Sequence, residues 1–124
     1  MSAQLKGIVS EHGEIAALIA EVRRKHDDGA DWADLARMLD SLVATVTMHF
    51  ESEEKAMEQA GYPLLAEHAA NHATFVRRLQ VLRAECDRRE TELMAIFMDS
   101  VENWFKNHER TADGLVLDYL AAHR

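Results

Sequence analysis

The chain has 124 residues, a length that suits one domain with a buried core and is too short for two. It is 48% hydrophobic and 29% charged, with five glycines and one proline, which is typical of a helical globular protein and excludes a disordered chain. The formal net charge of -8 disfavours nucleic acid as a partner, because it repels phosphate. No apolar segment resembles a signal peptide or a membrane span. We therefore expect one domain over residues 1–124, in the cytoplasm and not in a membrane.

The first half of the chain is predicted to form two long helices, because apolar residues recur with helical spacing and helix breakers are sparse. The first helix covers residues 3–27 and ends shortly before Gly29. The second covers residues 32–60, with Asp31 as its N-cap and Gly61 at its C-terminal end. Both helices are amphipathic, so each is expected to bury one face.

The second half predicts two further long helices. Pro63 suits the first turn of the third helix, which runs to Arg89. The fourth begins near Thr91, and a short C-terminal helix covers residues 114–122. Four helices of similar length with short connections predict an all-α fold, a four-helix bundle with a short C-terminal helix.

Polar residues stand on the buried stripe of every predicted long helix, where leucine is the usual residue. They are His12 on the first helix, His49 and Glu53 on the second, His68 and His72 on the third, and His108 on the fourth. The rest of the fourth stripe is expected at Leu93, Phe97, Val101 and Trp104. A lone buried histidine is usually a hydrogen-bonded core residue. Several imidazoles and a carboxylate in one apolar core need a positive charge to offset their desolvation, which favours a metal site.

The spacing on the second helix separates ligand candidates from surface acids. Glu53 follows His49 by four residues and lies about 40° around the helix axis from it, one turn along. Both side chains can therefore reach the same ions. Glu51 and Glu54 lie about 200° and about 140° away from His49, so we expect them to be solvated.

The third and fourth helices complete the ligand set. His68 and His72 are also four residues apart and can chelate one ion. His108 and Asp113 are five apart, which a regular helix does not bring together but a π-bulge or a frayed last turn does. Five imidazoles and two carboxylates suffice for two octahedral ions. A nitrogen-rich set favours iron over magnesium or calcium, and zinc and manganese stay open as alternatives.

These residues occur in blocks that resemble the hemerythrin family, especially its bacterial members. The blocks are His49-x-x-x-Glu53, then Tyr62-Pro63 with His68-x-x-x-His72-x-x-Phe75, and finally Trp104-Phe105-x-x-His108-x-x-x-x-Asp113. They cover most of the chain and stand in the family's order, and together they are much more specific than any single pair.

The resemblance implies an up-down-up-down bundle that contains two iron ions (Fe2+/Fe3+) with an oxo or hydroxo bridge. It implies that one iron is held by His68, His72 and His108, the other by His12 and His49, and that Glu53 and Asp113 bridge them. Dioxygen is then expected at the iron with two histidines. The implied function is dioxygen binding for carriage, storage or sensing.

Three residues near His108 are expected beside the ligand. Trp104 and Phe105 line an apolar pocket, whereas Glu109 stands where the family usually has an aliphatic residue. A carboxyl group at the open iron position favours an alternative function, a di-iron peroxidase or a nitric-oxide or oxidant-handling enzyme. The ligand is then another small diatomic molecule or a peroxide. A sensing role requires a separate protein partner, still unidentified.

Two further residues fall outside this pattern. Cys86 is a single cysteine that cannot form an internal disulfide, and we expect it to be structural. His26 matches no position of the blocks and is expected at the surface, as is His123.

Overall fold

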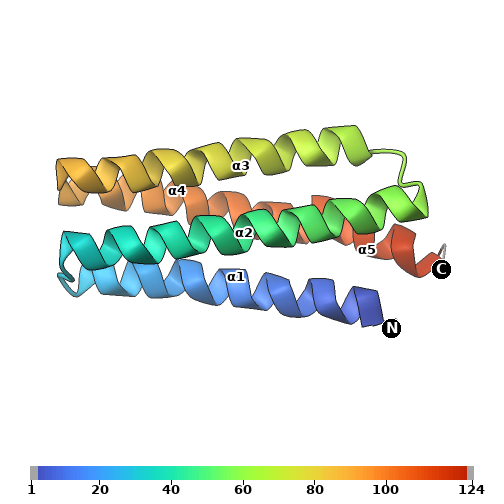
Figure 1. Ribbon diagram of the computed structural model, residues 1–124, viewed down its shortest axis with the longest axis horizontal. Coiled ribbons are helices and arrows are strands. Elements are labelled where there is room, and N and C mark those ends of the chain that lie inside the picture. Colours follow the sequence, from blue (N-terminus) through green and yellow to red (C-terminus); the bar gives the residue numbers. More distant parts are fainter. Residues whose placement is uncertain (1–2, 123–124) are drawn as a thin grey trace.

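The computed structural model describes the backbone of residues 3–122, and the side chains of these residues except 3–6, 8–10, 109 and 113. Its α-helices are α1 (Ala3–Asp27), α2 (Trp32–Ala60), α3 (Leu65–Glu85), α4 (Thr91–Arg110) and α5 (Ala112–Ala122). A short 3-10 turn, η1 (Cys86–Arg88), follows α3, and no strand occurs within residues 3–122. The predicted all-α fold is therefore confirmed (Figure 1).

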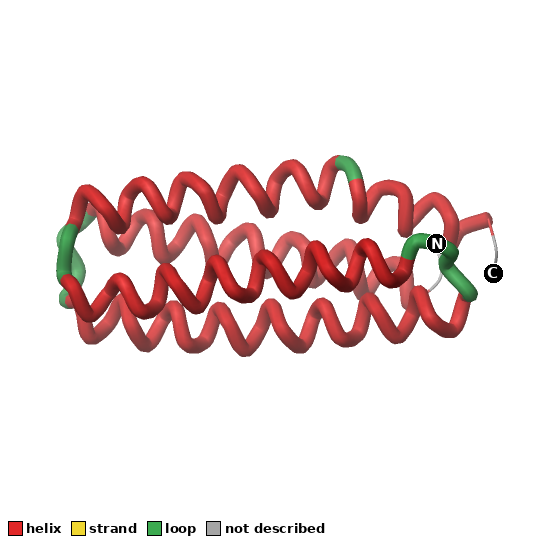
Figure 2. Tube along the Cα trace, turned by 90° about the horizontal axis from the view of Figure 1, so that it is seen from above, coloured by secondary structure: helices red, strands yellow, loops and turns green. Residues whose placement is uncertain are grey.

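The four long helices form a closed ring around one core. α2 packs against α1 and α3, and α4 packs against α3 and α1. Successive helices are joined at alternating ends of the bundle, so neighbours run in opposite directions (Figures 1 and 2). The up-down-up-down topology implied by the resemblance is confirmed. This topology brings α1, α2, α3 and α4 together along the length of the core.

The ends of α2 follow the local signals in the sequence. The Asp31 carboxylate accepts a hydrogen bond from the backbone N–H of Ala33 at 3.5 Å, as an N-cap does. Gly61 adopts a left-handed conformation with φ 69°, and its N–H donates to the carbonyl of Glu58. Both predicted caps of α2 are confirmed, and its predicted bounds agree with the structure.

The ends of α3 differ from the prediction by a few residues. Pro63 lies in the turn before the helix, which begins at Leu65. At the other end the α-helix stops at Glu85, and Arg89 closes the following 3-10 turn in a left-handed conformation with φ 57°. The chain must reverse direction at both places, and these residues supply the turns.

The break between α4 and α5 lies at Thr111, with φ -103° and ψ -75°. Its N–H and its hydroxyl both donate to the carbonyl of Asn107, at 3.0 and 2.7 Å. Where the sequence predicted a π-bulge or a frayed last turn, α4 ends at Arg110, and α5 begins at Ala112 and not at residue 114. α5 continues beyond the end of α4 toward the C-terminal end of the bundle, after a short loop (Figure 2). Asp113 consequently falls in the first turn of α5.

The core confirms the predicted stripe on α2 and changes the one on α4. The buried α2 residues include Leu35, Leu39, Leu42, Val46, His49, Glu53 and Met57. On α4 the buried apolar residues are Met94, Met98, Val101 and Phe105, whereas the predicted Leu93, Phe97 and Trp104 are only partly buried. The apolar surface of α4 is wide, and packing against α1 and α3 buries its Met94–Phe105 side.

Two isolated side chains are also placed by the packing. His26 is buried, with its ring edge-on to Trp32 at 6.1 Å between centroids, so its expected surface position was wrong. Cys86 is buried in the core, in keeping with a structural role. His123 lies outside the described residues.

From residue 3 to residue 122, none of the helices combines the length and apolarity needed to span a membrane.

Candidate metal centre

The centre is built on α2, which presents His49 and Glu53 to the core one turn apart. The Glu53 side chain is fully buried, with 0% of its surface exposed, and His49 is 3% exposed. A carboxylate so deep in an apolar core needs compensating partners. Histidines from the other three long helices surround it.

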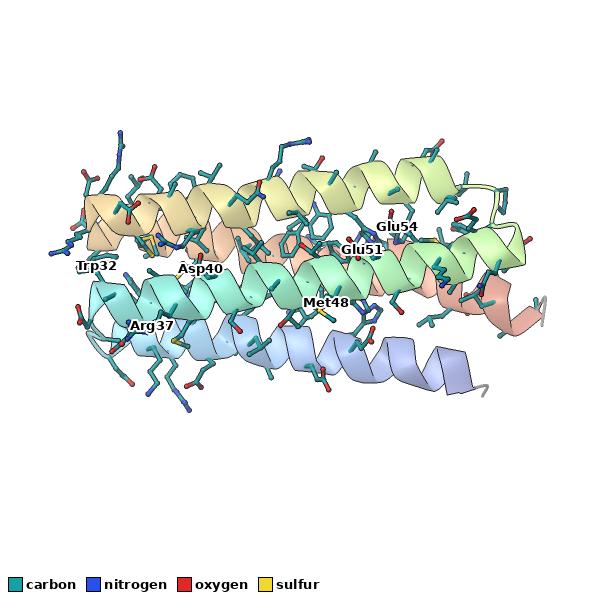
Figure 3. The ribbon with its side chains drawn as sticks, in the orientation of Figure 1. Trp32, Arg37, Asp40, Met48, Glu51 and Glu54 are labelled. Atoms are coloured by element: carbon teal, nitrogen blue, oxygen red, sulfur yellow. The ribbon has the colours of Figure 1, made fainter. Side chains whose placement is uncertain are left out.

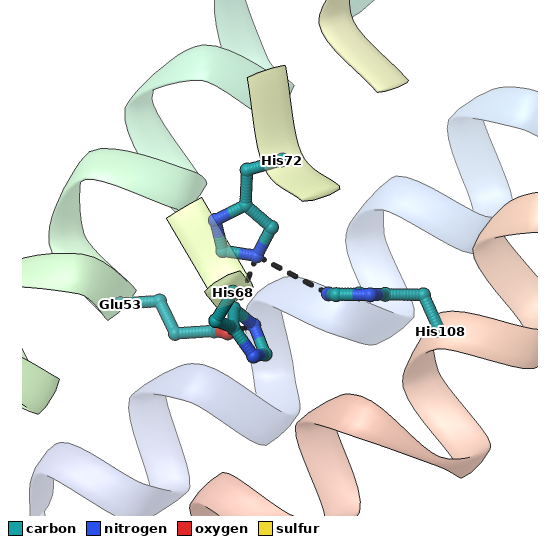
Figure 4. A group of neighbouring side chains, drawn as sticks. All are labelled: Glu53, His68, His72 and His108. Carbon is teal, nitrogen blue, oxygen red and sulfur yellow. Dashed lines mark hydrogen bonds and ion pairs between the residues drawn. The ribbon is translucent and has the colours of Figure 1, made fainter. Parts of the chain in front are cut away.

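The first group joins α2, α3 and α4. It comprises Glu53, His68, His72 and His108, whose possible ligand atoms all lie within 4.8 Å of one another. Nε2 of His68 lies 2.7 Å from Oε1 of Glu53. Nε2 of His72 lies 3.5 Å from the same oxygen and 3.2 Å from Nε2 of His108. All four side chains are buried, and Figure 4 shows them converging on one region.

The second group joins α1 and α2 on the other side of the carboxylate. It comprises His12, His49 and Glu53, with ligand atoms again within 4.8 Å. Nε2 of His12 and Nε2 of His49 each lie 3.2 Å from Oε2 of Glu53. The two imidazole rings meet edge to face, with 4.8 Å between their centroids.

Glu53 belongs to both groups and faces each with a different oxygen. Oε1 is turned toward the histidines of α3, and Oε2 toward those of α1 and α2. A carboxylate in this position can bind one cation through each oxygen. The arrangement therefore provides two adjacent cation positions that share one bridging side chain.

The carboxylate and the imidazoles of the centre shift one another's pKa. Burial raises the pKa of Glu53, but contacts with the surrounding histidines outweigh burial and hold this pKa well below its usual range. Burial lowers the pKa of His49, but its contacts with Glu53 and Glu11 outweigh that effect and raise the pKa above its ordinary value. Without a metal, the buried carboxylate is thus stabilised by protonated or hydrogen-bonding imidazoles.

The donor atoms fit transition-metal ions. Nitrogens about 2.1 Å from one ion and at right angles would lie about 3 Å apart, close to the 3.2 Å between the Nε2 atoms of His72 and His108. Nε2 of His49 is buried without a hydrogen bond in the described structure, although it lies near Glu53. A cation would satisfy these nitrogen lone pairs and balance the carboxylate.

Two acids outside the ligand set also touch the centre. An oxygen of Glu54 lies 2.9 Å from Nδ1 of His72, and an oxygen of Glu11 lies 2.6 Å from Nδ1 of His49. Glu54 lies on the side of α2 that faces α3 (Figure 3), where it is 32% exposed and contacts His72, so it is partly buried and not fully solvated as expected. Glu51 is exposed, as expected. Angular positions around α2 could not predict these contacts, because the His72 partner of Glu54 lies on α3 and the Glu11 partner of His49 lies on α1.

Trp104 and Phe105, which were expected beside the bound ligand, pack against different histidines of the centre. Trp104 stacks on the ring of His108, with 4.5 Å between centroids and 16° between planes. Phe105 is buried and meets His12 edge-on at 6.3 Å. The side chains of Glu109 and Asp113 lie outside the described residues, so six of the seven expected metal ligands are placed. All six are brought together.

Comparison with known proteins agrees with this arrangement. Residues 4–120 match the family model of the hemerythrin HHE cation binding domain. The chain is 32% identical over 103 residues to a bacteriohemerythrin of Methylococcus capsulatus, covering 82% of this chain and 79% of that protein. It is 31% identical over 91 residues to a bacteriohemerythrin of Stenotrophomonas maltophilia, covering 73% of this chain and 59% of that protein.

A third relative extends the match along the chain. A bacteriohemerythrin of Pseudomonas aeruginosa is 30% identical over 116 residues, which are 90% of this chain and 71% of that protein. No solved structure matches the chain significantly. The family model and these relatives, on a bundle whose core gathers histidines around a shared glutamate, show that the chain belongs to the hemerythrin family.

Proposed function

We propose that this protein holds two iron ions in its core and binds dioxygen there. The first iron is bound by His68, His72 and His108, and the second by His12 and His49. Glu53 bridges them, and Asp113 is the second bridge expected from the sequence. The observation that carries the proposal is that Glu53 turns one oxygen to each group of histidines.

The identity of the metal follows from the donors and the relatives. Imidazole-rich sets favour transition metals, whereas magnesium and calcium prefer oxygen donors. Relatives named bacteriohemerythrin favour iron among these metals. Two ferrous ions together can supply two electrons to a bound oxygen molecule, which is the chemistry that the centre contributes.

The protein residues favour a small apolar ligand at the second position. Two histidines serve that position and three serve the first, so the second has room for an exogenous ligand. Phe105 is buried and meets the His12 ring edge-on. Ile15 follows His12 by about one turn of α1 and is also buried. Such apolar neighbours favour a small apolar molecule such as dioxygen as the ligand.

An oxidant-consuming enzyme would need a proton donor at the open position. The sequence candidate is Glu109, whose side chain is not among those described, and no observation favours this second function. Action as a single domain, a cytoplasmic location and a protein partner stay predictions from the sequence.

Metal analysis and optical spectra test the proposal. The purified chain is reconstituted with ferrous iron without air, and iron per chain is then measured. We expect two irons, with charge-transfer absorption in the near ultraviolet appearing on mixing with oxygen and disappearing on argon purging. One iron or none contradicts the di-iron centre. Two irons that oxidise irreversibly contradict dioxygen binding while leaving the centre intact.

A further inference from the structure

Two histidines of the candidate centre contact a carboxylate through the ring nitrogen that is not turned toward Glu53. His49 meets Glu11 at 2.6 Å and His72 meets Glu54 at 2.9 Å, in both cases through Nδ1. The opposite ring nitrogen, Nε2, faces Glu53 in both histidines. Among the described side chains, one such pair belongs to each group of ligands, so each metal position has a histidine that contacts a carboxylate in this way.

This contact controls which nitrogen is free to bind metal. A neutral imidazole has one N–H and one lone pair, and a carboxylate can only accept a hydrogen bond. A carboxylate at Nδ1 therefore keeps the proton on Nδ1 and leaves the Nε2 lone pair directed into the core. It also resists rotation of the ring, and such partners increase the basicity of a metal-binding histidine.

We propose that Glu11 and Glu54 are positioning residues, each of which prepares one metal position by orienting its histidine. Glu54 acts through His72 on the position shared with His68 and His108, and Glu11 acts through His49 on the position shared with His12. This inference rests on the proposed di-iron function. It adds two acids that are not ligands to the residues that determine metal affinity.

The two pairs differ in the other contacts that fix the orientation of the histidine ring. His72 is stacked face to face on Phe50, with 3.7 Å between centroids, and Glu54 lies between α2 and α3. His49 meets Phe50 only at a tilt, with centroids 5.8 Å apart. Glu11 and His49 also line an open cavity of about 410 Å³ between α1 and α2.

The two acids are similarly exposed, Glu11 at 40% and Glu54 at 32%, and both histidine side chains are 2% exposed. The pairs differ in aromatic packing, because Phe50 stacks face to face on His72 and not on His49. The position with three histidines should accordingly bind the first ion, and the position with two histidines should bind the second. Glu11 contributes a larger share of the orientation of its histidine than Glu54 does. Loss of Glu11 should weaken the second binding event alone.

The chain offers a matched control for each acid. Glu14 lines the same cavity as Glu11 and lies on the same helix, but no hydrogen bond to a histidine is found for it in the described structure. Glu51 is exposed on α2, three residues before Glu54. Each control removes the same charge from the same surface without touching an imidazole.

The experiment is a titration of the metal-free full chain with Co2+ as the probe ion, without air and against a competing chelator. Cobalt absorption reports the two binding events separately. We expect Glu11→Ala to weaken the second event by about 10–100-fold and leave the first unchanged. Glu54→Ala should weaken the first event, by an amount toward the lower end of that range because the Phe50 stack remains.

Conservative variants separate orientation from charge. Glu11→Gln and Glu54→Gln keep an oxygen that accepts the Nδ1 hydrogen bond, so they should restore most of the lost affinity. Glu14→Ala and Glu51→Ala should titrate like the parent. In the cobalt protein, the shifted Nδ1–H resonance of the affected histidine should exchange faster with solvent in each alanine variant.

Three results would overturn the inference. Equal weakening of both events by one variant would indicate general destabilisation, and glutamine variants as weak as the alanine variants would indicate charge alone. Alanine variants that bind like the parent would show that neither acid positions its histidine. A parent chain that binds fewer than two ions contradicts the proposed function instead, before any variant is compared.

Discussion

The imidazole of His72 is stacked face to face on the phenyl ring of Phe50, with 3.7 Å between ring centroids and 3° between ring planes. Phe50 follows His49 directly on α2, so this contact joins the helix of Glu53 to the helix of His68 and His72. A ring stacked in this way cannot rotate without losing the contact. Phe50 is thus a core residue that also limits the orientation of a candidate ligand.

Replacing this ring with leucine should weaken metal binding while the protein stays folded. Phe50→Leu keeps most of the buried volume and should lower the free energy of unfolding of the metal-free protein by less than about 1.5 kcal/mol. Loss of an aromatic stack worth about 0.5–1.5 kcal/mol should weaken the first metal-binding event by roughly 2–10-fold. Chelator competition measures this affinity, and urea unfolding measures the stability.

The matched control is Leu39→Ala, a change in the fully buried core of α2 that is not at the centre. It should cost about 2–5 kcal/mol of stability but leave metal affinity unchanged. Parent-like affinity in Phe50→Leu would show that the stack contributes only to packing.

Removal of the shared carboxylate should affect both metal positions. Glu53→Ala deletes the fully buried side chain that faces both groups, leaving two cations less neutralised in a dry core. We expect iron content to fall from two ions per chain to well below one. Glu51→Ala changes an exposed acid two residues away and should keep both irons. Equal iron content in the two variants, measured after identical reconstitution, would refute the shared-carboxylate arrangement.

The metal-free and iron-loaded proteins should depend on pH in opposite directions. The pKa of His49 is raised from 6.5 in the folded metal-free protein, so its stabilising contribution is complete below pH 6.5 and is lost as pH rises through the raised pKa. The pKa of Glu53 is lowered from 4.5, so its contribution is present above pH 4.5 and is lost only in stronger acid. Metal-free stability from these groups should therefore be greatest between these two values.

Iron reverses this trend, because its histidine ligands must be deprotonated. The loaded protein should lose iron, and the stability that iron adds, as pH falls to roughly 5. Thermal unfolding followed by circular dichroism, for both forms between about pH 5 and 8, gives the two slopes. Parallel curves would mean that the metal does not replace protons on these histidines.

The single thiol should react slowly while the protein is folded. Cys86 is 2% exposed, and burial raises its pKa, so at pH 8 it has less thiolate than a free cysteine. Labelling with a thiol reagent should be at least about tenfold slower than labelling of the unfolded chain. Cys86→Ala should keep the full iron content, because Cys86 lies about 20 Å along the helical path from His72. Rapid labelling of the folded protein would contradict a structural role.

Local signals in the sequence determined the helices and most of their ends. Asp31 and Gly61 act on their own neighbours through hydrogen bonds and backbone conformation, so the bounds of α2 could be predicted without knowledge of its partners. The four-residue spacing that places His49 and Glu53 on one face is likewise a property of a single helix. For these features the cause and its effect lie within a few residues of each other.

Only the tertiary structure decided the features that depend on a second helix. α4 has apolar residues on both sides of its predicted stripe, and packing against α1 and α3 selected Met94 and Met98 over Leu93 and Phe97. Glu54 meets His72 across the interface of α2 and α3. The spacing along one helix gives the direction in which a side chain leaves that helix. Its contacts depend on where the neighbouring helix lies, because a hydrogen bond requires the two atoms to come within about 3 Å.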